Sequence, residues 1–336
     1  IRAILRSAVY QIKYMDSIPD HAVCSESVKL AVKKGFSGLR GYVNGVLRSV
    51  VKGIDEVEYP SDPIKRLSVR YSCPEWIIRL WKETYDLSLI ETMLKDFQTE
   101  KPTTIRRCRS RITTEQLKKR LEEEHVLVEN HPYLKDALLI SKYDYLESLE
   151  TFREGLFVVQ DISSMLVGEL AHVQAGAQVI DLCAAPGGKA LDVAERILME
   201  GQAGCSGHVE ARDLTEYKVS LIEENIERMG LCNVTAVCQD ASVYDEKSAG
   251  KADIVIADLP CSGLGVLGKK TDLKYKASPE GIVSLVKLQR KILSCAASYV
   301  KPGGELLYST CTVNPKENIE NVHWFLKEFP EFYADD

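Results

Sequence analysis

The chain has 336 residues, of which 45% are hydrophobic and 27% are charged, a composition typical of a globular protein with more than one domain. It shows no signal peptide, and no apolar run approaches the ~18 residues of a membrane span, so no membrane segment is expected. Its ten cysteines are scattered and include no C-x-x-C pair, which argues against a zinc site and against a disulfide framework and predicts a reducing, cytoplasmic location.

The net charge of −6 is unevenly distributed along the chain. Residues 1–120 contain 23 Lys and Arg against 14 Asp and Glu, so the remainder is acidic. A basic first third suits a polyanion such as RNA, although a solvated surface has the same composition. Because the chain starts at Ile1, we expect the true N-terminus to be missing.

Residues 1–53 are expected to form three helices. In residues 1–15 apolar side chains recur at helical spacing, and a proline-containing break follows. Residues 21–35 repeat the pattern and end on Gly35, a residue typical of helix C-termini. Residues 38–53 predict the third helix, so this part of the chain reads as a helical bundle.

Residues 54–71 are a charged linker, and Pro74 suits the first turn of a further helix. A basic strand or loop follows at residues 101–112, and then a helix with Thr114 as its expected N-cap. The basic stretch suits phosphate and stacked-base contacts, although a salt-bridged face against residues 122–124 is an alternative. Its arginines are Arg106, Arg107, Arg109 and Arg111.

From residue 155 onward, apolar strands alternate with amphipathic helices. This alternation predicts an α/β domain built on a doubly wound parallel sheet, whose ligands sit at the carboxyl ends of the strands. The expected strands are 179–182, 208–214, 234–241, 252–258 and 305–313, and the expected helices are 190–200, 216–230, 284–300 and 316–329.

A small-residue turn follows the first of these strands. It lacks the spacing of a dinucleotide fingerprint and of a P-loop, so an adenosyl ligand without a pyrophosphate, such as S-adenosylmethionine, fits it better. An ordinary loop between strand and helix would look similar. The candidate cofactor-binding residues in the turn are Cys183, Ala184, Ala185, Pro186, Gly187, Gly188 and Lys189.

Acidic residues end four successive strands: Asp181, Asp213, Asp240 and Asp258. Each alone could be a helix N-cap, but four in order behind the glycine turn indicate a cofactor site. The position of Asp213 suits an acceptor for ribose hydroxyls, and that of Asp240 suits the adenine.

Two cysteines, Cys261 and Cys311, stand just past apolar strands at the same predicted edge. Each alone is most simply a buried apolar residue. As a pair near a methyl donor, they indicate thiolate chemistry. A thiolate added to C6 of a pyrimidine makes C5 nucleophilic, and an acid such as Asp258 could assist at N3. No metal is expected.

The motifs DLCAAPGGK, DLPCSGLGV and STCTVNPKEN resemble those of the Sun/Fmu-type RNA cytosine-5 methyltransferases. The resemblance implies that Cys311 is the nucleophile and that Cys261 assists release. It also implies that the turn, Asp213, Asp240 and Asp258 hold S-adenosylmethionine. The RNA partner would be 16S ribosomal RNA, with its cytosine unpaired or flipped out, and the protein a monomer away from membranes.

LRSAVYQI, IPDHAVCSESVKLAVK and GYVNGVLRSV resemble the C-terminal half of a NusB-like RNA-binding domain. The expected domains are therefore 1–58 (NusB-like), 59–154 (a basic linking α+β domain) and 155–336 (a Rossmann-like methyltransferase). Two positions depart from the family pattern. Thr271 replaces a frequent Pro before Asp272, and Cys108 replaces a frequent Asn.

Three other functions are alternatives to this interpretation. A transfer RNA cytosine-5 methyltransferase would share the catalytic motifs but not the NusB-like start. A non-catalytic RNA-binding ribosome-assembly factor would not need two intact cysteines. A nicotinamide oxidoreductase fails on the glycine spacing. The reverse assignment, with Cys261 as the nucleophile after Pro260, resembles the DNA pyrimidine-5 methyltransferases.

Overall fold

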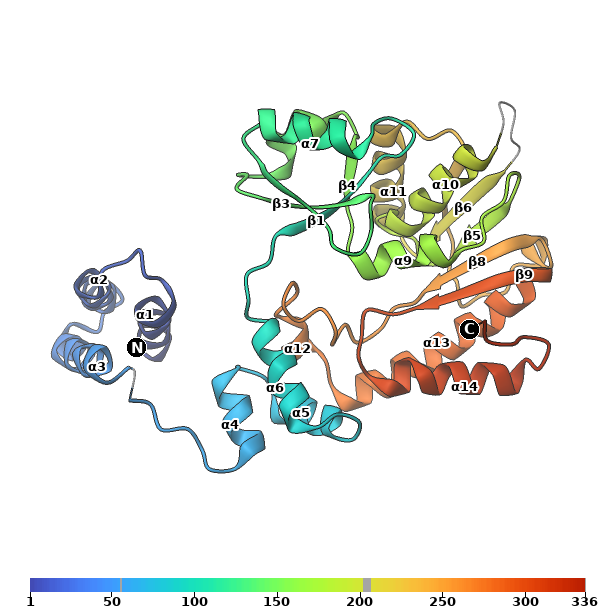
Figure 1. Cartoon of the computed structure of the whole chain (residues 1–336). Helices are drawn as coiled ribbons and strands as arrows, with labels where there is room; N and C mark the ends of the chain where they lie inside the picture. The colour runs from blue at the N-terminus through green and yellow to red at the C-terminus, as the bar shows by residue number, and fades with distance from the viewer. Residues whose placement is uncertain (55, 202–206, 336) are drawn as a thin grey trace. The chain divides into compact units, whose positions relative to one another are not determined.

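A computed structural model describes residues 1–54, 56–201 and 207–335 (Figure 1). The chain divides into two compact units, Ile1–Ser72 and Cys73–Asp336. Within the described residues, none of the helices combines the length and apolarity needed to cross a membrane.

The first unit is helical, as predicted. The apolar faces of three helices, α1 (Arg2–Tyr14), α2 (Asp20–Lys33) and α3 (Arg40–Gly53), enclose a core that includes Ala8 and Leu47. Gly35 follows α2 with a φ of +86°, a conformation that favours glycine and ends the helix. The short helix α4 (Pro63–Arg70) closes the unit and is capped by Asp62.

The second unit begins with α5 (Glu75–Lys82) and α6 (Leu87–Asp96), followed by a small antiparallel sheet. The sheet has the order β2-β3-β1-β4, from strands β1 (Thr103–Arg107), β2 (Leu127–Asn130), β3 (Ala137–Ser141) and β4 (Phe157–Val159). Because β4 pairs with β1, the sheet extends past the expected domain boundary at residue 155.

Helices α7 (Thr114–Glu123) and α8 (Glu150–Arg153) accompany this sheet. The N-cap of α7 is Thr113, one residue before the predicted Thr114. The Thr113 hydroxyl accepts from the Gln116 amide, and the Gln116 side chain accepts from the Thr113 amide, which forms a capping box. This reciprocal pair decides between the two adjacent threonines, since Thr114 lacks a Gln or Glu three residues later.

The predicted doubly wound sheet is confirmed. Five parallel strands have the order β7-β6-β5-β8-β9. They are β5 (Gln178–Asp181), β6 (His208–Asp213), β7 (Val234–Cys238), β8 (Ala252–Asp258) and β9 (Val300–Ser309). The strand order reverses at β5, so the carboxyl ends of β5 and its neighbours flank the position where such sheets bind ligands.

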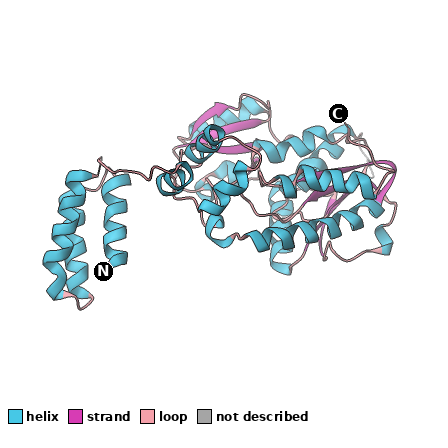
Figure 2. Ribbon diagram, turned by 90° about the horizontal axis from the view of Figure 1, so that it is seen from below, coloured by secondary structure: helices cyan, strands magenta, loops and turns pink. Residues whose placement is uncertain are grey.

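Helices cover both faces of this sheet (Figures 1 and 2). Alternate strand residues supply two cores, with Val179 facing one and Ile180 the other. The first core includes α9 (Ile162–Leu170), α10 (Gly188–Glu200) and α11 (Glu216–Met229). The second includes α13 (Pro279–Tyr299) and α14 (Ile319–Glu328). The predicted elements leave residues 301–304 between a helix and a strand. In the structure they lie inside β9, which begins directly after α13 ends at Tyr299.

The expectation that the arginines of residues 101–112 contact RNA is wrong for Arg106 and Arg109, and so is the alternative pairing with residues 122–124. Arg106 is fully buried and pairs with Asp192 and Glu195 of α10. Arg109 pairs with Asp136, at 2.6 Å, and with Asp192. Although burial opposes it, the two guanidinium groups hold the pKa of Asp192 below its usual value. These ion pairs fasten the antiparallel sheet to α10.

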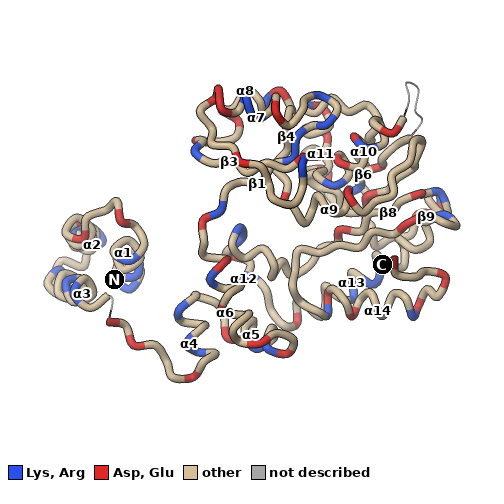
Figure 3. The backbone as a smooth tube through the Cα atoms, in the orientation of Figure 1, with Lys and Arg blue, Asp and Glu red and all other residues tan. Residues whose placement is uncertain are grey.

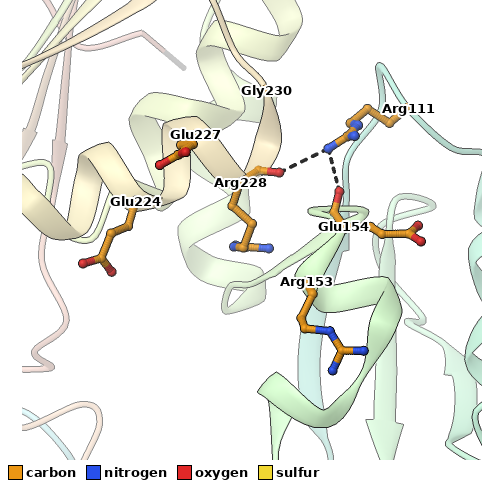
Figure 4. Close-up of a pocket in the computed structure, with 7 residues that line it drawn as sticks. All are labelled: Arg111, Arg153, Glu154, Glu224, Glu227, Arg228 and Gly230. Atoms are coloured by element: carbon orange, nitrogen blue, oxygen red, sulfur yellow. Dashed lines mark hydrogen bonds between the residues drawn. The ribbon is translucent and has the colours of Figure 1, made fainter.

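Arg107 and Arg111 also serve the fold. Arg107 pairs with Asp136 at 2.7 Å. Arg111 donates to the carbonyl oxygens of Glu154 and Arg228 beside a pocket of about 490 Å³ (Figure 4). The neighbouring Cys108 is fully buried, so its side chain cannot contact RNA.

We expect Arg106→Met to destabilise the protein by about 3–5 kcal/mol, because removing one partner leaves buried carboxylates uncompensated. Denaturant unfolding measures this free energy. The control is Arg79→Met, whose partner Glu75 is solvent-exposed, with an expected change of roughly 0.5 kcal/mol or less. An Arg106 variant that unfolded like the wild type but lost RNA affinity would restore the RNA-contact interpretation.

Candidate functional site

The turn at residues 183–189 joins β5 to α10. Its amides are fixed by the neighbouring strand, since Ala184 donates to the Arg212 carbonyl at 2.8 Å. Gly187 has a φ of +112° and precedes the first residue of α10 without a side-chain cap. The N–H groups of this first helical turn have no intrahelical partner, which suits an approaching polar ligand. The Ala185–Pro186 peptide bond is cis.

Asp213 ends β6 and braces the turn. One carboxylate oxygen accepts from the Ala185 amide at 3.0 Å, and the other accepts from the Leu214 amide at 2.7 Å and from Lys218 at 2.9 Å. The side chain is 4% exposed. The structure therefore adds a role to the predicted ribose contact, because this carboxylate also sets the shape of the cofactor turn.

We expect Asp213→Ala to weaken S-adenosylmethionine binding by about 1–3 kcal/mol, the cost of leaving hydrogen bonds to a charged acceptor unmade. Calorimetric titration of the protein with the cofactor measures the change. The matched control is Lys218→Met, which keeps the Ala185 and Leu214 hydrogen bonds and should bind nearly as the wild type. Equal affinities for Asp213→Ala and wild type would contradict both roles of this carboxylate.

Asp181 and Asp258 end the adjacent strands β5 and β8. Burial, with the nearby Asp258 carboxylate, raises the pKa of Asp181 to about 7, and one of its oxygens has no hydrogen-bond partner. Asp258 accepts from Lys189 at 2.5 Å and from Ser309 at 2.9 Å. In this pairing Asp258 accepts a hydrogen bond from an ammonium group, and its expected role as an acid at N3 stays a prediction.

Asp240 lies two residues beyond β7 and is exposed. It accepts from the Ser242 amide at 2.8 Å, and this hydrogen bond lowers the pKa of Asp240. No contact with another predicted site residue is recorded for it in the part of the chain that the structure describes. Its position at the same sheet edge fits the predicted contact with adenine, which stays a prediction.

The two cysteines meet at this edge. Cys261 follows β8, Cys311 follows β9, and their Sγ atoms are 3.3 Å apart. The Gly265 amide donates to the Cys311 carbonyl at 3.1 Å, and a Cβ at Gly265 would come within 2.9 Å of that oxygen. Glycine at this position thus permits the close approach that brings the loops together.

The pair is electrostatically asymmetric. A hydrogen bond from the Cys261 thiol, assisted by the charge of Lys270, lowers the pKa of Cys311 to about 7. The same hydrogen bond, with burial, raises the pKa of Cys261. Cys311 is also the more exposed of the two residues. The Cys311 thiol is therefore the more readily ionised of the two.

Sequence reasoning missed Lys270 and the buried Glu317. Both lie in or near quoted motifs, but a lysine in a basic run and a glutamate in a short turn carry no distinctive spacing. Lys270 belongs to a basic segment with Lys269, Lys274 and Lys276 around α12 (Leu273–Lys276), which Figure 3 shows in blue. The network around Glu317 becomes visible only when the two cysteine loops are placed side by side.

The residues at this edge fit an adenosyl methyl donor. The turn presents small side chains and an uncapped helix N-terminus, and Asp181 holds a buried oxygen without a partner. Carboxylate acceptors stand on the neighbouring strands at Asp213 and Asp240, which suits a ligand rich in hydroxyl and amino donors.

Comparison with known proteins gives three family matches. Residues 169–335 match the 16S rRNA methyltransferase RsmB/F family, residues 1–52 the NusB family, and residues 73–145 the ferredoxin-like domain of RsmF/B-like methyltransferases. These matches confirm the resemblance drawn from the motifs, including the helical start.

Similar proteins cover nearly the whole chain. The probable ribosomal RNA small subunit methyltransferase B of Bacillus subtilis is 35% identical over 99% of this chain and 73% of its own length. Ribosomal RNA small subunit methyltransferase B of Vibrio cholerae is 31% identical over 96% of this chain and 72% of its own length. The crystal structure of PH0851 gives a TM-score of 0.80 at 27% identity, covering 99% of this chain and 73% of that one.

Proposed function

The chain belongs to the RsmB/F family of rRNA methyltransferases that use S-adenosylmethionine, and we propose that it methylates C5 of a cytosine in 16S ribosomal RNA. The observation that carries the proposal is the contact between Cys261 and Cys311, 3.3 Å apart at the ligand edge of the sheet. A single nucleophile suffices for attack on a pyrimidine. A second thiol beside it suits a reaction that must also release its product.

In the proposed reaction the Cys311 thiolate forms a bond to C6, and the electron pair of the C5–C6 double bond becomes available at C5. The turn at residues 183–189 would hold S-adenosylmethionine, which would supply the methyl group as an electrophile: the C5–methyl bond would form as the sulfonium–methyl bond breaks, and S-adenosylhomocysteine would leave. Once Cys311 is bonded to C6, the hydrogen bond to its thiolate that raised the pKa of Cys261 is lost. Cys261 can then release its own proton to solvent and, as a thiolate, accept the C5 proton. The electron pair of the C5–H bond restores the C5–C6 double bond and expels the Cys311 thiolate.

N3 of the cytosine needs a proton or a hydrogen bond while Cys311 is attached. We assign this task to the Lys189–Asp258 pair, in which Lys189 is the donor and Asp258 orients it at 2.5 Å. Ser309, two residues before Cys311, holds the other oxygen of Asp258 at 2.9 Å. This link between β8 and β9 would keep the N3 partner in register with the nucleophile.

The substrate must present C6 to a thiol at the protein surface. A cytosine stacked in a helix hides C6, so the target is unpaired or flipped out. We assign rRNA binding to the NusB-like region 1–58 and to the linking region 59–154. Residues 155–336 would perform the chemistry, in a cytoplasmic monomer that needs no membrane.

The test is bisulfite sequencing of ribosomal and transfer RNA from cells with and without the gene. One protected cytosine in 16S ribosomal RNA should be lost with the gene and regained with the wild-type copy. Loss confined to transfer RNA would assign the enzyme to that substrate. Unchanged methylation of both RNAs, with a defect in ribosome assembly, would favour the non-catalytic binding factor.

A further inference from the structure

A buried carboxylate lies behind the two cysteine loops. Glu317 ends a short 3-10 helix, Pro315–Glu317, and is 0% exposed. Its oxygens accept from the Ser262 amide at 2.8 Å, the Ser262 hydroxyl at 2.6 Å, Asn314 at 2.9 Å and Gln289 at 3.2 Å. Four donors converge on two oxygens, which matches the acceptor capacity of a carboxylate.

These donors belong to the segments that carry the thiols. Ser262 follows Cys261, and Gln289 also donates to the carbonyl of Pro260, the residue before Cys261, at 2.9 Å. Glu317 thereby holds the chain on both sides of this cysteine. On the other loop, the Thr312 hydroxyl contacts the Ser262 hydroxyl at 2.9 Å and accepts from the Asn314 amide at 3.2 Å. Thr312 directly follows Cys311.

Glu317 forms no ion pair within the described residues, unlike the buried Glu195, which pairs with Arg106. A buried carboxylate without a cation is costly unless hydrogen bonds satisfy it. An amide or an apolar side chain in the same space would leave buried donors without acceptors. A function that requires this many convergent acceptor sites therefore explains the residue better than packing does.

We propose that Glu317 is a positioning residue that fixes the separation and relative orientation of the Cys261 and Cys311 thiols. It touches neither sulfur and acts through Ser262 and Thr312. The expected effect of Glu317 on catalysis rests on the proposed function. Its expected effect on the positions of the two thiols does not. Since both hydrogen bonds to Ser262 lie on the Cys261 side, release of the product depends on Glu317 more than attack does.

The variant that tests the proposal is Glu317→Gln. It keeps the volume of the side chain but replaces one carboxylate oxygen with an NH2 group, which would face hydrogen-bond donors. Displacement of a reacting group by about 1 Å can cost 10²-fold in rate. We therefore expect kcat to fall by about 10- to 100-fold, with a smaller change in kcat/KM for RNA, because the slowed step follows formation of the adduct. The fraction of folded enzyme caught on RNA as a covalent adduct, read on a denaturing gel, should rise above that of the wild type.

A second readout does not involve catalysis. Phenylarsine oxide forms two As–S bonds with a pair of neighbouring thiols and releases water, so its affinity reports whether Cys261 and Cys311 remain in contact. The Cys261→Ala variant measures the background from other cysteines. Wild type should bind the reagent tightly, and Glu317→Gln should bind it at least about tenfold more weakly.

The matched control is Glu195→Gln, the same substitution at an equally buried carboxylate whose partners, Arg106 and Ser110, lie outside the two cysteine loops. It should lower stability and leave both the arsenical affinity and the adduct fraction per folded molecule unchanged. If Glu317→Gln does not fold, Ser262→Ala removes the hydroxyl that links Glu317 to Thr312 and should shift both readouts in the same direction.

Wild-type arsenical affinity in a folded Glu317→Gln or Ser262→Ala protein would overturn the positioning role. Failure of the proposed function looks different. No adduct would then form in any variant, Cys261→Ala included. The wild type would still bind phenylarsine oxide more tightly than Glu317→Gln.

Discussion

Cys311→Ala should abolish methylation while leaving RNA binding intact. Without the Sγ atom no bond to C6 can form, and C5 lacks the electron density to attack a methyl sulfonium. Removal of a nucleophile from a catalytic group that acts as a unit typically costs 10³-fold or more. The measurement is transfer of labelled methyl groups to 16S ribosomal RNA, beside an RNA-binding titration.

RNA affinity is the control within this experiment. The side chain is small, and phosphate contacts elsewhere carry most of the affinity, which should fall steeply with salt in both proteins. If both cysteines were merely structural, each alanine variant would lose about 1 kcal/mol of stability and keep its activity. Methylation by Cys311→Ala at the wild-type rate would therefore end the proposal that this residue is the nucleophile.

The same residue predicts a pH dependence. Because the pKa of Cys311 is lowered to about 7, the thiolate fraction rises as the pH increases through 7 and is nearly complete above 8. The rate of adduct formation should rise over that range and then level off. Lys270→Met removes a charge that favours the thiolate, so the midpoint should move to higher pH.

The edge of the parallel sheet could be predicted because its signals are local. An acid or a cysteine stands at or shortly after the end of each apolar strand, and parallel strands align their carboxyl ends, so these side chains had to come to one edge: Asp181, Asp213, Asp258, Cys261 and Cys311. The contact between the two sulfur atoms could not be predicted in this way. It depends on β8 and β9 being neighbours, with Asp258 level with Ser309, and no sequence period encodes that pairing.

The arginines of residues 106–111 are a case in which a charge pattern gave a wrong prediction. A basic composition suggests that each cation is free to bind RNA, but an acidic residue that pairs with it can lie far along the chain. Arg106 finds Glu195 on α10, 89 residues away, and both side chains are fully buried. The same limit hid Glu317, whose donors at Ser262 and Gln289 are 55 and 28 residues distant. Long-range polar networks have no sequence spacing by which to find them.

Cys261→Ala should have the opposite phenotype to Cys311→Ala. Attack and methylation still proceed in this variant, because Cys311 remains. Loss of the C5 proton then stalls, and the enzyme stays bonded to its RNA through Cys311. On a denaturing gel the variant should run as a slow band that nuclease treatment removes. Turnover should fall by at least about 10²-fold, the lower range for a lost acid–base group.

The double variant decides the assignment of the two cysteines. With Cys311 also replaced by alanine, no adduct can form, so the slow band should disappear. If Cys261 were the nucleophile instead, Cys311→Ala would give the slow band and Cys261→Ala would not. The structure favours the first outcome on physical grounds, since Cys311 has the lowered pKa and greater exposure, whereas the hydrogen bond to Cys311, together with burial, raises the pKa of Cys261.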